Sequence, residues 1–226
     1  MDFTISENIK RIQYDIEEAK VRYRKSDDIV KFMAVTKTVP YERVNYAINE
    51  GITLLGENRV QEYLSKKDFY DNRAEIHFIG HLQSNKIKYI ADSVTLIHSV
   101  DSFKLASEID KQAKRLNKCM DVLIEVNIGR EESKNGVLSE NIEEMIYEIA
   151  QLENIYVRGL MTIPPIFNSE ESFYKMQGLF NDLQAKRIDN TCIDTLSMGM
   201  SSDYALAVKY GSNIVRIGSG LFGARK

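Results

Sequence analysis

The chain has 226 residues, of which 43% are hydrophobic and 28% charged, a composition ordinary for a soluble globular protein. Its formal net charge of −3 argues against a nucleic acid or an anionic membrane as the main partner, so we expect neither. The two cysteines, Cys119 and Cys192, are too few for a secreted disulfide scaffold. We expect structural thiols in a reducing compartment, in keeping with the burial habit of free cysteine.

The first segment predicts an amphipathic helix over residues 4–26. Ile9, Ile12, Ile16 and Ala19 recur at spacings of three and four residues, and the opposite face is charged. This segment lacks the apolar stretch of a signal peptide, and no run elsewhere is apolar for long enough to cross a bilayer. We therefore expect a cytoplasmic protein.

After this helix, short apolar runs alternate with segments of helical period. The runs predict eight strands, at residues 32–35, 53–55, 76–79, 94–97, 122–126, 157–160, 193–196 and 214–217. The segments between them predict helices at residues 41–50, 58–66, 84–91, 101–117, 139–152, 169–187 and 202–210. This alternation indicates a parallel sheet, and the nearly continuous apolar runs indicate strands that are buried on both faces.

Eight such units fit either an open doubly wound sheet or a closed barrel, and the count favours a (β/α)8 TIM barrel of the α/β class. Only residues 220–226 form the tail after the last strand, so we expect the eighth outer helix to be absent or very short. The N-terminal helix could cover that gap. No repeat or linker divides the chain, so residues 1–226 are predicted to form a single domain.

Lys37 is the first candidate for chemistry, because barrels place their sites where strands end and loops begin. It closes the apolar first strand, in AVTKT. Position alone fits a solvated lysine. A partly buried amine could instead attack an aldehyde and form a Schiff base, so both interpretations stay open on position alone.

The glycine-rich segment 218–223 is the second candidate. It matches GxGxxG, but only three residues follow it, and a dinucleotide site needs a long helix, a second unit and an acid about 20 residues on. Gly218 and Ser219 could instead present backbone N–H groups to a phosphate, at a loop position where barrels often bind one.

Ser197 and Ser201 lie in the preceding loop and could add a helix N-terminus to this phosphate site. Ser201 alone is equally well explained as the N-cap of segment 202–210. In a closed barrel the first strand neighbours the eighth, so a phosphorylated aldehyde could reach both Lys37 and these loops.

Six motifs occur in order over about residues 30–224: AVTKT, GENRVQE, HFIGHLQSNK, RGLMTI, SMGMSSD and VRIGSGLFG. In these motifs the chain resembles the YggS/PROSC family, the pyridoxal phosphate homeostasis proteins. The resemblance implies an alanine-racemase-like barrel that binds pyridoxal 5′-phosphate (PLP) and stores or delivers it.

The resemblance also implies a role for each matching residue. Lys37 would carry PLP as a Schiff base, and Arg216 would direct its guanidinium at the pyridine nitrogen. The phosphate would be held by Ser201, Gly218 and Ser219. The rest of the pocket would be lined by Asn58, His81, Ser197 and Met198, with Lys134 at the rim.

Arg216 makes efficient catalysis unexpected. An arginine stays protonated and donates to an unprotonated pyridine nitrogen, which makes the ring a poor electron sink. Racemases of this fold add a second base, a tyrosine from a further β-domain of the neighbouring subunit. This chain stops at Lys226, soon after the barrel, so we expect no counterpart of that tyrosine. We expect a monomeric cofactor-binding protein without catalytic residues, with apo PLP-dependent enzymes as its recipients.

Two other functions stay open. A weak PLP-dependent amino-acid racemase or lyase would need a second base, and Tyr204 and Tyr210 are expected only to pack or cap. A phospho-sugar aldolase or isomerase would use Lys37 on a substrate carbonyl. No cluster has metal-ligand spacing, so we expect no metal. Glu57 could orient a neighbour or cap the following helix, and His77 and His98 are expected to be ordinary strand residues.

Overall fold

The computed structural model describes residues 3–25, 27–165 and 167–224. Its eight strands follow one another in sequence order around a closed barrel, which confirms the predicted (β/α)8 fold. The described residues fall into two compact units, one up to His77 and again from Ser197 onward, the other over residues 78–196. The single domain over residues 1–226 stays a prediction.

The first unit contains the N-terminal helix, the first strands and the C-terminal end of the chain. Its elements are α1 (Phe3–Tyr23), β1 (Lys31–Val35), α2 (Tyr41–Asn49), β2 (Leu54–Glu57), α3 (Val60–Lys66), the 3-10 helix η1 (Lys67–Phe69), α7 (Tyr204–Lys209), β8 (Ile214–Ile217) and α8 (Ser219–Phe222). Strand β3 (Glu75–Phe78) begins in this unit, and β7 (Thr191–Ser197) ends in it.

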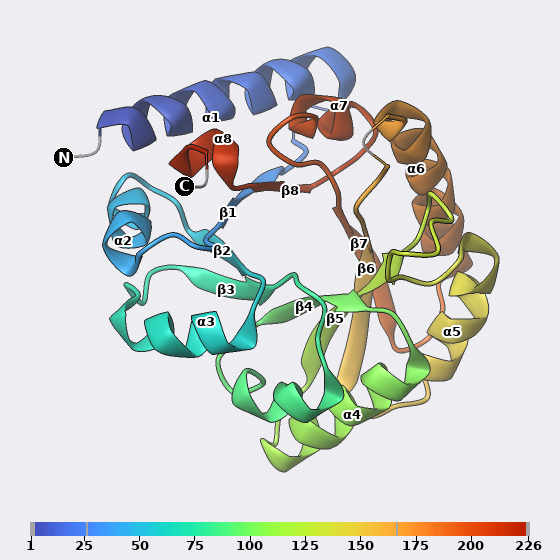
Figure 1. The fold of residues 1–226 in the computed structure, drawn as a ribbon. Coiled ribbons are helices and arrows are strands. Elements are labelled where there is room, and N and C mark those ends of the chain that lie inside the picture. The colour runs from blue at the N-terminus through green and yellow to red at the C-terminus, as the bar shows by residue number, and fades with distance from the viewer. Residues whose placement is uncertain (1–2, 26, 166, 225–226) are drawn as a thin grey trace. The chain divides into compact units, whose positions relative to one another are not determined.

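Helix α1 confirms the helix predicted over residues 4–26 but ends at Tyr23, and Ser26 lies outside the described residues. Its isoleucines and Ala19 are buried in a cluster with residues of β1, β2, β8, α7 and α8. Each buried aliphatic side chain of this kind contributes roughly 1.5–3 kcal/mol. Figure 1 shows α1 lying along α8 and α7, so the N-terminal helix covers the place of the missing long eighth helix, as predicted.

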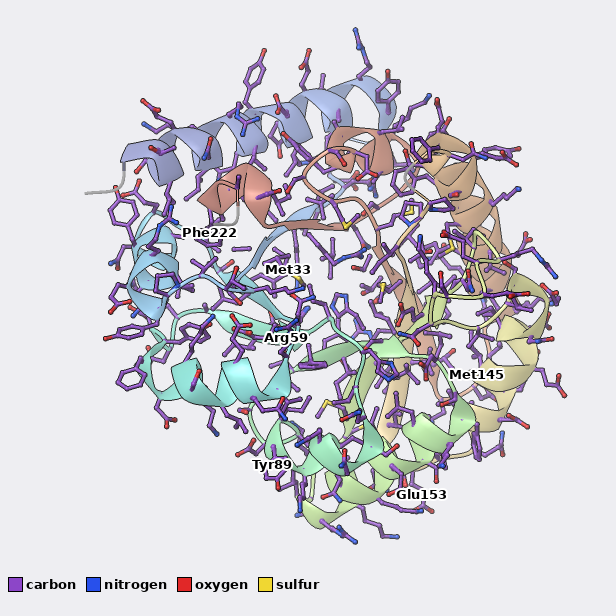
Figure 2. All side chains as sticks on the ribbon, viewed as in Figure 1. Met33, Arg59, Tyr89, Met145, Glu153 and Phe222 are labelled. Carbon is purple, nitrogen blue, oxygen red and sulfur yellow. The ribbon has the colours of Figure 1, made fainter. Side chains whose placement is uncertain are left out.

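Strand β1 is the centre of the first unit's sheet. It pairs in parallel with β8, from Lys31↔Ile214 to Ala34↔Ile217, and with β2, at Ala34↔Leu55 and Val35↔Gly56. Ala34 packs with the α1 isoleucines, so the alternate residue Met33, fully buried and labelled in Figure 2, lies on the opposite face of the strand.

The second unit contains the middle of the chain. Its elements are the 3-10 helix η2 (Ser84–Tyr89), β4 (Leu96–Val100), α4 (Phe103–Arg115), β5 (Met120–Val126), the 3-10 helix η3 (Ser139–Asn141), α5 (Ile142–Ile149), β6 (Ile155–Thr162) and α6 (Ser169–Lys186). Ser102 caps α4 by accepting a hydrogen bond from the Leu105 N–H. Strand β5 pairs in parallel with both β4 and β6.

Three local expectations were wrong. Residues 84–91 were expected to form an α-helix, and η2 is a 3-10 helix. The fourth strand was expected at residues 94–97 and lies at Leu96–Val100, where the buried His98 and Ser99 continue it. Cys119 and Cys192 are exposed rather than buried, since each lies at the amino end of a strand. His77 and His98 are strand residues, as expected.

Within the described ranges, no helix has both the length and the apolar character needed to cross a membrane.

Candidate functional site

All predicted site residues except His81 and Lys134 belong to the first unit. Strands β2, β1 and β8 are adjacent and parallel, and Ser197 at the end of β7 pairs in parallel with Ile214 of β8. Parallel neighbours present their carboxyl ends at the same edge of a sheet. The first unit therefore gathers the loops that carry Lys37, Asn58, Ser201 and Gly218 at one edge.

Lys37 lies in the turn that follows β1, where it is half-buried. The turn is held on both sides of the lysine. The Thr36 N–H donates to the Gly56 carbonyl at 3.2 Å, and the Val39 N–H donates to the Thr36 carbonyl at 2.9 Å. Thr38 adopts a positive φ of 64°, and its N–H donates to Glu62 Oε1 at 2.5 Å. The Lys37 backbone is thus fixed by its neighbours.

Glu57 forms a buried polar cluster behind this turn. Its side chain is fully buried, and Oε1 accepts hydrogen bonds from the Thr36 hydroxyl at 2.7 Å and the Tyr70 hydroxyl at 2.5 Å. Burial raises the pKa of Glu57, although these two hydrogen bonds oppose the rise. Arg59 is the N-cap of helix α3, so Glu57 does not cap this helix. The hydrogen bond from Thr36 fits the other role left open for Glu57, which is to orient a neighbour.

Tyr70 is the partner that sequence reasoning missed. It follows η1, 13 residues after Glu57, and no motif or spacing links the two. Only its aromatic character suggested burial.

Arg216 lies within β8 with 4% of its surface exposed. Its Nη1 donates to the Ser197 Oγ at 2.7 Å, and its backbone N–H donates to the Gly199 carbonyl at 3.0 Å. Ser197 and the adjacent Met198 are fully buried. The Ser197 hydroxyl thereby fixes a buried guanidinium on β8, the strand next to β1, and its role toward a cofactor stays a prediction.

Ser201 joins the β7–α7 loop to the β8–α8 turn. Its Oγ accepts a hydrogen bond from the Gly220 N–H at 3.0 Å. Helix α7 begins three residues later at Tyr204, with Asp203 at its N-cap position, so of the two roles left open for Ser201 the N-cap of this helix does not apply. The hydroxyl thus links the β7–α7 loop to the short helix α8.

Gly218 and Ser219 open α8 next to β1. A Cβ placed on Gly218 would lie 3.4 Å from the Val35 Cβ, so the turn runs close against β1. Ser219 is exposed, and the first N–H groups of a helix have no partner within that helix. These residues can therefore present donors to an anionic group.

Asn58 contributes an unsatisfied acceptor at the end of β2. Its Oδ1 is buried without a hydrogen-bond partner among the described residues. An unsatisfied buried acceptor costs about 1–3 kcal/mol, and a bound polar ligand could remove that cost. The residue thus fits the pocket-lining role predicted for it.

His81 and Lys134 belong to the second unit. About half of the His81 side chain is exposed, and its Nδ1 lies 3.6 Å from Asp101 Oδ2. The Lys134 Nζ lies 2.5 Å from Glu131 Oε1 and 3.3 Å from the Pro164 carbonyl oxygen. Their places in the site stay predictions. Among the described residues, no group of three or more His, Cys, Asp or Glu side chains could hold a metal ion.

Known proteins match this chain over nearly its whole length. Residues 8–226 match the family model described as alanine racemase, N-terminal domain. A relative from Aquifex aeolicus (strain VF5), named pyridoxal phosphate homeostasis protein, is 44% identical over 225 residues that cover 97% of this chain and 98% of the relative.

Solved structures agree on the fold. PipY of Synechococcus elongatus PCC7942, with PLP bound, is 29% identical and has a TM-score of 0.81 over 97% of this chain and all of its own. An alanine racemase from Clostridium difficile 630 has a TM-score of 0.71 at 19% identity, over 97% of this chain and 57% of the racemase. The racemase likeness is one of fold alone.

Proposed function

Because the chain belongs to the family of pyridoxal phosphate homeostasis proteins, we propose that it binds PLP in the cytoplasm and stores or delivers it. The observation that carries the proposal is the convergence, in the first unit, of the Lys37 turn, the buried Arg216 and the joined loops of Ser201 and Gly220. PipY, whose structure was solved with PLP bound, supports the same cofactor.

Each of these residues would have a distinct role toward PLP. When bound, PLP supplies an aldehyde that condenses reversibly with an amine and a ring that can withdraw electrons. The Lys37 amine would replace the aldehyde oxygen as a Schiff base, with release of one water. Ser201, Gly218 and Ser219 would hold the phosphate through a hydroxyl and backbone N–H groups.

The remaining pocket residues would orient the ring. Asn58, with its unsatisfied buried Oδ1, would gain a partner there. Ser197 and Met198 would line the pocket beside Arg216. A pocket role for His81 rests on the motif resemblance alone.

Arg216 is the reason we propose a carrier rather than an efficient enzyme. Its guanidinium stays protonated and is oriented by the Ser197 hydroxyl at 2.7 Å. Directed at the pyridine nitrogen, it would donate a hydrogen bond and leave that nitrogen without a proton. The ring would then stabilise a carbanion poorly, which disfavours racemisation and decarboxylation.

An absorbance spectrum of the purified protein tests the proposal. A visible band that is lost in Lys37→Ala, and a pyridoxyl adduct on Lys37 after borohydride reduction and peptide mass analysis, would support it. Lys31→Ala is the matched control, because Lys31 begins the same strand with about half of its side chain exposed and should leave the band unchanged.

A colourless protein that stays apo when incubated with PLP would overturn the proposal and favour a phospho-sugar enzyme. An α-proton exchange assay with amino acids separates the remaining functions, since rapid exchange would indicate a racemase or lyase. We also propose a monomer that supplies apo PLP-dependent enzymes. Light scattering tests the first point, and reactivation of an apoenzyme in the presence of a trap for free PLP tests the second.

A further inference from the structure

Helix α8 is too short to satisfy its own carbonyl groups. It spans four residues, and the last carbonyls of any helix need partners from outside it. Three side chains supply them. Arg11 Nη2 donates to the Gly220 carbonyl at 3.1 Å, Asn8 Nδ2 to the Leu221 carbonyl at 2.9 Å, and Arg43 Nη2 to the Phe222 carbonyl at 3.0 Å.

These donors come from two different helices of the first unit. Asn8 and Arg11 are one turn apart on α1, which lies along α8 (Figure 1). Arg43 belongs to α2, and its guanidinium also lies over the ring of Phe222, 6.0 Å from the centroid. Phe222, labelled in Figure 2, ends α8. The carboxyl end of α8 is thus held by hydrogen bonds from both α1 and α2.

The opposite end of α8 is the proposed phosphate site. The Gly218 carbonyl accepts hydrogen bonds from the N–H groups of Leu221 and Phe222, at 3.0 and 2.9 Å, so the two ends of the turn are linked directly. A helix of one turn has little stability of its own, because its nucleation is unfavourable. External contacts must therefore set where the N–H groups of the turn point.

We propose that Asn8, Arg11 and Arg43 are positioning residues that hold the β8–α8 turn in the conformation that binds the cofactor's phosphate. The inference rests on the proposed function and extends it to two helices that would not touch the cofactor.

A comparison of PLP with pyridoxal, the same aldehyde without the phosphate, tests the proposal. Dissociation constants are measured by absorbance titration for the wild type, Arg11→Ala, Arg43→Ala and the double variant. Each single substitution removes one hydrogen bond to a carbonyl and should weaken PLP binding by about 2- to 10-fold. The double variant should lose more than either single variant, while the affinity for pyridoxal stays within about twofold.

Two control variants separate the loss of a positioning hydrogen bond from the loss of a positive charge. Arg22→Ala removes the same charge from α1, where the Arg22 guanidinium lies over the Tyr23 ring, and should leave PLP affinity unchanged. Arg43→Lys keeps a charged donor and should recover part of the affinity lost in Arg43→Ala. Thermal unfolding of each variant confirms that the chain is folded during the titration.

The outcomes are distinguishable. Equal loss of affinity for both ligands, or no loss for either, would overturn the positioning role. Ser201→Ala distinguishes failure of the positioning role from failure of the proposed function. If Ser201→Ala weakens PLP selectively and the arginine variants do not, the phosphate site stands and the positioning role is refuted. If the wild type binds neither ligand, the proposed function itself fails.

Discussion

Gly159 offers a sharp test of the packing in the second unit. It lies in β6 with a φ of +147°, where the register between β5 and β6 shifts, so that Gly159 faces Leu123. A Cβ at this position would lie 1.9 Å from the Thr195 carbonyl oxygen and 2.8 Å from the Thr195 carbonyl carbon. Both atoms belong to the backbone of β7, so no side-chain rotation could relieve the clash.

The expected cost of Gly159→Ala follows from two contributions. Overpacking against a fixed neighbour costs about 1–3 kcal/mol, and an L residue held in an unfavourable backbone region costs about 1–3 kcal/mol more. The sum of about 2–6 kcal/mol is a large part of the 5–15 kcal/mol by which a typical protein is stable. We expect Gly159→Ala to be folded marginally or not at all.

Gly178 provides the matched control. It lies exposed in the interior of α6, and a Cβ there would have no atom within 4 Å. Adding the same methyl group at this position should stabilise the protein by about 0.5–1 kcal/mol, because glycine has the greater conformational entropy to lose.

Urea unfolding followed by circular dichroism measures both variants. With an m-value of about 1–3 kcal/mol per molar, the unfolding midpoint should fall by about 1 M or more for Gly159→Ala and rise by a few tenths of a molar for Gly178→Ala. A Gly159→Ala variant within about 0.5 kcal/mol of the wild type would refute the close approach of β6 and β7 at Thr195.

Three further predictions concern the charged and polar contacts. The pKa of Glu57 is raised above its ordinary value of 4.5, so the folded state binds the proton more tightly and this stabilising contribution is present below pH 4.5 and lost as the pH rises through the raised pKa. In Glu57→Gln, free energies of unfolding measured over a pH series should lack that decline, and curves parallel to the wild type would contradict the assignment. Tyr204 donates a hydrogen bond to Asp15 of α1, and burial and this contact raise its pKa to about 12. Tyr204→Phe should lower the melting temperature by about 2–8 °C, whereas Tyr14→Phe, on an exposed side chain of α1, should leave it unchanged; equal melting temperatures for both variants would argue against the contact. Arg158 donates to Asp121 at 3.0 Å and also to Asp194, with about a third of each side chain exposed. Arg158→Met should cost about 1 kcal/mol at low salt and less in 1 M salt, and a loss that does not depend on salt would show that packing dominates.

Local patterns predicted the framework because their causes are local. The isoleucine spacing in residues 4–26 was enough to place α1, since a helix repeats its buried face every three to four residues. The strand predicted at residues 214–217 matches β8, and the short tail after it correctly predicted a very short eighth helix. The predicted strands also put Lys37 just after β1 and Arg216 within β8.

Two side chains whose local roles the sequence left open serve distant segments instead of their own. Ser201 fitted either an N-cap or a phosphate ligand, and its hydroxyl accepts a hydrogen bond from the Gly220 N–H. Glu57 was expected to cap or orient, and the choice was decided by Thr36 and Tyr70. Propensities describe what a residue does with its neighbours in sequence. In both residues the side chain bonds instead to a partner that folding brings close.

The sequence by itself determined the order of strands and helices, the amphipathic first helix and which residue types stand at the strand ends. Only the tertiary structure decided which of those ends meet and what supports them. Arg11 and Gly220 are 209 residues apart, and their hydrogen bond exists because β1 pairs with β8 and brings the first and last helices together. Hydrophobic periodicity is encoded within a few residues, whereas a hydrogen bond between two helices remote in sequence depends on how the strands that follow and precede them pair.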